Sequence, residues 1–113
     1  MSGIVFVMFN VLVVNDRVTP MEFVASVLQD VFGHSEEMGK RVALLAHLNG
    51  DAVCRVCRNR VEAQALVSRA VALSREHDYP LDFTIVPVSF WQSIAARLFH
   101  MAKKLAPSGG SAP

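Results

Sequence analysis

The sequence predicts an α+β fold: a β-α-α-β-α-β sandwich with a three-stranded antiparallel sheet and helices on one face, plus an extra C-terminal amphipathic helix. Three short segments rich in Val, Ile and Phe alternate with longer segments of helical periodicity, an order that indicates one sheet covered by helices. With 113 residues, of which 52% are hydrophobic, the chain is long enough for one core and too short for two substantial ones.

The first strand and the first helix are expected before Gly33. Residues 4–14 are almost entirely apolar and predict a buried strand. We expect a helix after the following turn, with Thr19 as its N-cap, Pro20 at its first position and Glu22 completing a capping box. Gly33 is expected to end this helix.

The second helix and the second strand follow without a long loop. Ser35 is a helix-starting residue, and the two glutamates after it are favoured in a first turn. The Asn-Gly-Asp sequence of residues 49–51 predicts a turn, and residues 52–57 predict a strand.

A long third helix and a third strand complete the expected core. Asn59 can cap a helix that runs to about His77, and Tyr79 and Pro80 then break it. Residues 81–88 predict the last strand. We therefore expect residues 1–88 to form the core domain.

The end of the chain predicts a separate extension. Residues 89–106 predict an amphipathic helix, and residues 107–113, rich in Gly, Ser and Pro, predict a flexible tail. The apolar stripe of that helix consists of Trp91, Ile94, Leu98, Met101 and Leu105. Two interpretations stay open: the stripe packs on this domain or on a second copy of it, or it contacts a partner or an anionic membrane surface.

Composition and spacing exclude several classes of function. The net charge of +1 is too balanced for a general nucleic-acid binder, and the N-terminus lacks the basic region of a signal peptide, so we expect a cytoplasmic protein. Cys54 and Cys57 stand three apart on an expected strand, which would direct them to opposite faces, so we expect neither a metal site nor a disulfide. No nucleophile motif or phosphate loop is present, so we expect no enzyme and no cofactor.

One segment does point to a family. Residues 11–24, with the sequence VLVVNDRVTPMEFV, resemble the signature of the ClpS family, the adaptors of the bacterial ATP-dependent Clp protease. The resemblance continues in residues 35–37, in Ala46-His47, in residues 75–77 and in Tyr79-Pro80-Leu81. It extends from about Val11 to Thr84.

The resemblance implies a non-enzymatic adaptor. Proteins of this family bind substrates that begin with Leu, Phe, Tyr or Trp, the bulky hydrophobic N-degrons. They deliver these substrates to the N-domain of a Clp/Hsp100 unfoldase of the ClpA or ClpC type for ATP-dependent proteolysis. The alternative is a diverged interaction module that has lost N-degron binding and uses its C-terminal helix to contact a partner or a membrane.

The resemblance also implies a binding site. Asn15, Asp16 and His47 match the positions that accept the α-amino group of the N-degron. The hydrophobic pocket matches Thr19, Met21, Val24, Ala43, Ala46 and Leu81. Met21 corresponds to the family's gatekeeper, which screens out β-branched side chains by steric conflict.

Two residues of the predicted site depart from the family pattern. Arg17 stands where the family has a second acidic residue, so it either repels the ligand's ammonium group or points to solvent while Asp16 acts alone. Ala43 stands where the family often has Met, and a smaller side chain would enlarge the pocket in favour of large aromatic residues. Without the resemblance, Asn15 and Asp16 are ordinary turn residues and Thr19 is explained as a cap.

Overall fold

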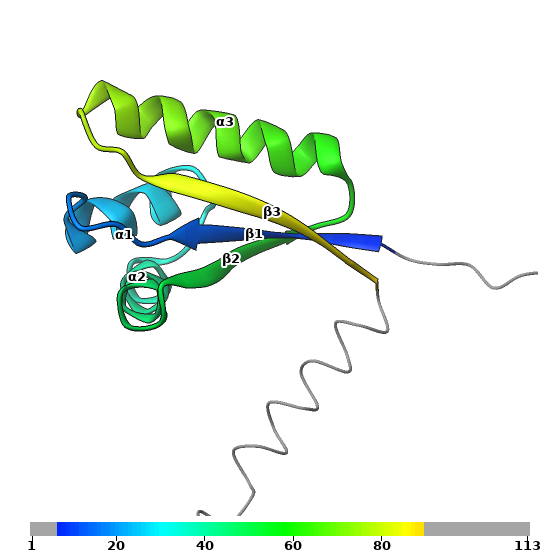
Figure 1. Ribbon diagram of the computed structural model, residues 1–113, viewed down its shortest axis with the longest axis horizontal. Helices are drawn as coiled ribbons and strands as arrows, with labels where there is room; N and C mark the ends of the chain where they lie inside the picture. The colour runs from blue at the N-terminus through cyan, green and yellow to red at the C-terminus, as the bar shows by residue number, and fades with distance from the viewer. Residues whose placement is uncertain (1–6, 90–113) are drawn as a thin grey trace, which may run out of the picture.

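A computed structural model of the chain describes residues 7–89 (Figure 1). The elements follow the predicted order: β1 (Val7–Val14), α1 (Met21–Asp30), α2 (Glu36–Asn49), β2 (Asp51–Cys57), α3 (Arg60–Glu76) and β3 (Asp82–Ser89). Residue 89, the first residue of the predicted C-terminal extension, is the last residue of β3. The rest of the predicted C-terminal helix, the tail and the first residues of the expected first strand lie outside the described residues.

The three strands form one antiparallel sheet, as predicted, and their order in the sheet is β2-β1-β3. Strand β1 lies in the middle and is paired with both β2 and β3. At its end, Val14 is paired with Asp51 of β2 on one side and with Asp82 of β3 on the other. At this end of the sheet, β1 continues into α1 and α2 leads into β2. Helix α3 instead runs along the length of the sheet (Figure 1).

Burial alternates along the strands because successive side chains point to opposite faces. Val11 and Val13 of β1 are fully buried, and Phe83 of β3 is 8% exposed. On the other face, Val56 of β2 and Val86 of β3 are 46% and 37% exposed. Helix α3 packs against all three strands, and the core lies between the helices and one face of the sheet.

The prediction that the two cysteines point to opposite faces was wrong, because the pairing of β1 and β2 is irregular. Val11 pairs with Arg55 and Leu12 with Val53, which leaves Cys54 as an extra residue in β2. This bulge resets the alternation, so Cys54 and Cys57 are both buried in the core. Their thiols are not joined in a disulfide. Burial raises the pKa of the Cys54 thiol to about 12.

The helix ends agree with the sequence except at the start of α1. The Ser35 hydroxyl accepts from the backbone N–H of Met38, and the Asn59 side chain accepts from that of Glu62, so both predicted caps are confirmed. For α1, however, the N-cap residue is Pro20, and no side chain within the described residues caps the helix. The predicted N-cap role of Thr19 and the capping box with Glu22 are therefore wrong.

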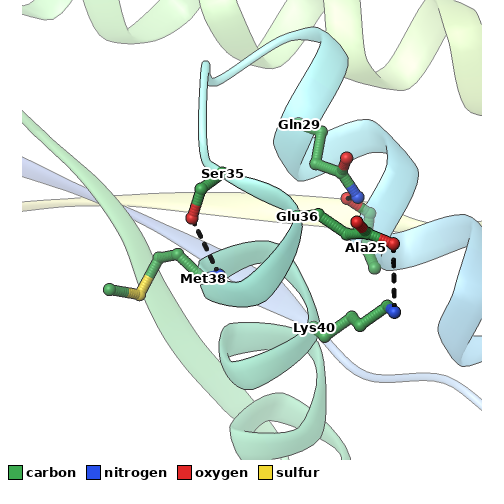
Figure 2. A network of polar contacts seen from close by, with 6 residues as sticks. All are labelled: Ala25, Gln29, Ser35, Glu36, Met38 and Lys40. Atoms are coloured by element: carbon green, nitrogen blue, oxygen red, sulfur yellow. Dashed lines mark hydrogen bonds and ion pairs between the residues drawn. The ribbon is translucent and has the colours of Figure 1, made fainter.

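Helices α1 and α2 cross closely, and a glycine makes this approach feasible. A Cβ atom added to Gly39 of α2 would lie 3.0 Å from the carbonyl oxygen of Ala25 in α1 and 3.2 Å from Cγ of Gln29. Around this crossing, Gln29 donates to the Ala25 carbonyl, and Glu36 pairs with Lys40 at 3.1 Å (Figure 2). The separation of the two helices is thus set by backbone contact, and these helices form the walls of the site described next.

Candidate functional site

The turn between β1 and α1 is organised by one carboxylate. Asp16 Oδ1 accepts hydrogen bonds from the backbone N–H groups of Val18 and Thr19 at 2.8 and 2.7 Å, and Oδ2 accepts from the Thr19 hydroxyl at 2.8 Å. This Asx-type arrangement explains why Thr19 does not cap α1: its hydroxyl is already engaged by the residue three positions earlier.

These contacts keep Asp16 ionised. Partial burial acts to raise the pKa of the Asp16 carboxyl, but the hydrogen bonds from Thr19 and Val18, together with the positive charge of Arg75, outweigh it and lower the pKa below its ordinary value of 3.8. The site therefore contains a fixed negative charge at neutral pH. A carboxylate can accept about four hydrogen bonds, so the three internal bonds leave limited capacity for a ligand.

A second contact joins this turn to the end of α2. The backbone N–H of Asn15 donates to the carbonyl of Gly50 at 2.9 Å, and the N–H of Gly50 donates to the carbonyl of Ala46 at 2.8 Å. Gly50 adopts a φ of 96°, a left-handed conformation that favours glycine. The last turn of α2, which carries Ala46 and His47, is thereby held beside Asn15.

A cavity of about 350 Å³ lies between this turn, α1 and α2. Its lining consists of Asn15, Asp16, Arg17, Thr19, Met21, Val24, Ala43, Ala46 and His47. The interior is formed by small and apolar side chains, since Val24, Ala43 and Ala46 are at most 6% exposed. The lining thus combines an apolar interior with polar groups contributed by the turn and by His47.

The polar groups of the lining differ in exposure: Arg17 and His47 are exposed, whereas Asn15 and Asp16 are half-buried. His47 is exposed on the last turn of α2, and within residues 7–89 neither of its ring nitrogens has a hydrogen-bond partner. Met21 is 36% exposed at the first position of α1. Met21 also lines a neighbouring groove of about 550 Å³ between α1 and α2, so it separates the two spaces.

One predicted pocket residue lies apart from the others. Leu81 is fully buried in the core and does not line the cavity. It is held by α3, because Arg75 Nη1 donates to the carbonyl oxygens of Tyr79 and Leu81 at 2.8 and 2.9 Å. Its assignment to the pocket stays a prediction from the resemblance.

Arg17 belongs to the cavity, although it was not among the predicted binding residues. Its side chain is exposed, yet it contributes to the lining beside Asp16. The sequence contained a signal for this placement, because Arg17 lies within the same motif as Asn15 and Thr19. The cavity therefore presents one positive and one negative side chain, together with the neutral amide of Asn15.

The arrangement suits the binding of a group that has an apolar part and a polar end. The amide oxygen of Asn15 and a neutral imidazole of His47 can each accept a hydrogen bond. In the part of the chain that the structure describes, no group of three or more His, Cys, Asp or Glu side chains could hold a metal ion. Nor is any helix among residues 7–89 long and apolar enough to cross a membrane.

Comparisons with known proteins agree on one family. The family model described as ATP-dependent Clp protease adaptor protein ClpS matches residues 6–84. The ATP-dependent Clp protease adapter protein ClpS of Nitrosospira multiformis is 42% identical over 74 residues, which cover 66% of this chain and 72% of that protein. The ClpS 2 adapter of Rhizobium meliloti is 45% identical over 80 residues, covering 71% of this chain and 78% of that protein.

A solved structure of the same kind matches the fold. The structure of Agrobacterium tumefaciens ClpS2 bound to L-phenylalaninamide superposes with a TM-score of 0.69 and 42% sequence identity. The match covers 72% of this chain and 96% of that one.

Proposed function

The chain belongs to the ClpS family of Clp protease adaptors, and from this premise we propose that it binds the bulky hydrophobic N-terminal residues of its substrates in the cavity between α1 and α2. The observation that supports this most directly is the cavity itself, whose apolar interior opens beside the polar groups of Asn15 and His47. In Agrobacterium tumefaciens ClpS2 the bound ligand is L-phenylalaninamide, a free α-amino group joined to a benzyl side chain. This ligand has the two chemical features that the cavity would accommodate here.

In the proposed binding mode, the interior of the cavity binds the substrate's first side chain, and the polar groups of the lining bind its α-amino group. The substrate's first side chain enters the space bounded by Val24, Ala43 and Ala46, where burial of its apolar surface stabilises the complex. The α-amino group stays beside these polar groups, where Asn15 and His47 accept its hydrogen bonds and the charge of Asp16 attracts it. Met21 at the rim excludes side chains that branch at Cβ.

Two side chains of the lining modify this scheme. Arg17 places a positive charge near the substrate's ammonium group, which weakens binding and makes it depend on salt. Ala43 leaves more room in the interior than a longer residue would, which favours Trp, Tyr and Phe over Leu at the substrate's first position.

Delivery completes the proposed function. We propose that the chain acts in the cytoplasm, catalyses no reaction itself, needs no cofactor, and passes bound substrates to the N-domain of a Clp/Hsp100 unfoldase of the ClpA or ClpC type. Its membership in a family of Clp protease adaptors supports this role. Nucleic acid is not among the proposed partners, because the net charge is only +1.

Fluorescence anisotropy of a labelled peptide that begins with Phe tests the proposal. We expect saturable binding that is lost when the peptide's α-amino group is acetylated, because acetylation removes the charge and two of its donors. His47→Ala should weaken binding strongly. His77→Ala is the matched control, since His77 is an exposed histidine that does not line the cavity.

The competing function is an interaction module that has lost N-degron binding. The presence of Arg17 in the lining favours it, because a cation there opposes an ammonium ligand. If the folded protein fails to bind peptides that begin with Phe, Tyr, Trp or Leu, the proposal of N-degron binding is contradicted and the result supports the interaction module.

A further inference from the structure

The face of the sheet opposite the helices is mostly apolar. Side chains that are direct cross-strand partners share a face. The residues of β1 that point away from the helices, together with their partners in β2 and β3, therefore form this surface. We call it the open face; its apolar residues are Met8, Leu12, Val14, Val53, Val56, Val86 and Val88, and its polar residues are Asn10, Asp51, Asp82 and Thr84.

The open face is unusually exposed for so apolar a surface. Val53 and Val56 of β2 are 45% and 46% exposed, and Val86 of β3 is 37% exposed. An antiparallel sheet with one solvated face normally carries polar residues there. The amide oxygen of Asn10, in the middle of this face, is buried without a hydrogen-bond partner in the described part of the chain. Both features indicate that part of the surroundings of this face lies outside residues 7–89.

We propose that residues 90–105 of this chain dock on the open face as an amphipathic helix. These residues follow β3 directly, so the segment is tethered at one end of the face and its first residues supply the turn that reverses the chain. Their apolar side chains recur every three or four positions, in one stripe from Trp91 to Leu105. A helix of this length spans about 23 Å, and an eight-residue strand such as β1 spans about 26 Å. A helix that turns back at the end of β3 therefore covers most of the length of the face.

The distribution of charge agrees with the direction that the connection to β3 imposes. Asp51 and Asp82 are the only charged residues of the open face, and both are exposed beside Val14 at the end of the sheet remote from residue 89. A helix that starts at residue 90 and returns along the sheet brings its C-terminal end to these two carboxylates. Lys103 and Lys104 are located at that end of the segment. The basic end of the segment thus meets the acidic end of the face.

Docking on this face leaves the candidate binding cavity open. That cavity is lined from the helix side of the molecule by Val24, Ala43 and Ala46. The docked segment would cover the opposite side of the sheet and would not obstruct the entry of a substrate. The proposal therefore stands independently of N-degron binding.

A tryptophan placed in the middle of the stripe reports on docking. In the full chain with Trp91→Phe and Leu98→Trp, the single tryptophan should emit at short wavelength and resist quenching by acrylamide in the monomer. Adding Val56→Glu or Val86→Glu to the open face should move the emission to longer wavelength and increase quenching. Val61→Glu is the matched control, because Val61 is 76% exposed on α3 and lies away from the face.

Far-UV circular dichroism verifies that each variant is folded. A charge exchange then tests the direction: Asp51→Lys with Asp82→Lys should expose the tryptophan, and Lys103→Glu with Lys104→Glu should restore its protection in that background. A long-wavelength, freely quenched tryptophan in the unaltered monomer would overturn the proposal. So would a blue shift that appears only with anionic phosphatidylglycerol vesicles or only in a concentration-dependent dimer measured by light scattering, since the occupant would then be a membrane or a second copy.

Discussion

Thr19 donates two hydrogen bonds to the carboxylate of Asp16, from its backbone N–H at 2.7 Å and from its hydroxyl at 2.8 Å. The pair closes the turn between β1 and α1 before any ligand arrives. Because this turn also carries Asn15 and Arg17 into the lining of the cavity, the polar side of the candidate site is organised by local contacts. Because these side chains are already ordered, binding of a ligand would not carry the entropic cost of ordering them.

Replacing the hydroxyl of Thr19 tests this role. Thr19→Val keeps the volume of the side chain but removes the donor to Asp16. We expect the free energy of unfolding to fall by about 1.5 kcal/mol, the low end for a hydrogen bond to a charged group, because Asp16 is only partly buried. Urea denaturation measures the change. Thr84→Val on the exposed side of β3 is the control, and an equal effect of both substitutions would contradict the role of the Thr19 hydroxyl.

The lowered pKa of Asp16 predicts a pH dependence of stability. The unfolded chain binds more protons than the folded chain just below the ordinary pKa of 3.8, so stability rises with pH in that range. The contribution of Asp16 should be fully present above about pH 5 and should be lost as the pH falls through the pKa of the folded state. We expect wild type to exceed Asp16→Asn in stability at pH 6 and the difference to shrink towards pH 2. A constant difference across this range would show that the carboxylate charge plays no part.

Reversing the charge of Arg17 should strengthen peptide binding. Arg17→Asp replaces repulsion of the substrate's ammonium group by attraction at an exposed position. We expect affinity for the Phe peptide to rise by roughly tenfold, equivalent to about 1.4 kcal/mol, and the gain to decrease at high salt. Anisotropy titrations at two salt concentrations measure both effects. Arg58→Asp, an exposed arginine outside the lining, should leave affinity unchanged; a similar gain there would attribute the effect to net charge alone.

Filling the space beside Ala43 should alter the preference among N-terminal residues. Ala43→Met adds a flexible side chain to the interior of the cavity, where Ala43 is 2% exposed. We expect binding of a Trp-initiated peptide to weaken more than binding of a Leu-initiated one, because the larger ring needs the space. Competition titrations with the two peptides measure the ratio. If the ratio does not change, the interior beside Ala43 does not receive the substrate's side chain.

Much of the fold could be predicted because local signals and global packing agree. The caps at Ser35 and Asn59 were expected from residue type alone. The start of α1 could not be predicted correctly, because Thr19 suits both an N-cap and the Asx-type turn. Asp16, three residues earlier, decides between the two by engaging the hydroxyl. The bulge at Cys54 was missed because a strict period of two assumes an uninterrupted pairing.

The candidate site depended more on the resemblance than on periodicity. Its two halves are separated by some twenty residues of chain, and the contact that joins them is the backbone hydrogen bond from Asn15 to Gly50. Nothing in the spacing of apolar residues indicates that pairing. Leu81 shows the complementary limit: its place in the pocket rests on a family motif alone, since it is fully buried and is not among the residues that line the cavity.

The crossing of α1 and α2 should control the width of the cavity. In Gly39→Ala the new Cβ would meet the Ala25 carbonyl at 3.0 Å, so the helices must move apart. Overpacking lowers the free energy of unfolding by about 1–3 kcal/mol. The higher helix propensity of alanine raises it by about 1 kcal/mol. We therefore expect a net loss of about 1 kcal/mol in the free energy of unfolding, together with weaker binding of the Phe peptide.

Binding should weaken because Met21 and Val24 on α1 move relative to Ala46 on α2. Ser35→Ala is the matched control: it removes the cap of α2 at a similar loss of about 1 kcal/mol but leaves the crossing intact. Its peptide affinity should equal that of wild type at a temperature where all three proteins are folded. A Gly39→Ala protein that is more stable than wild type and binds equally well would mean that the two helices separate without strain, and that their contact does not set the width of the cavity.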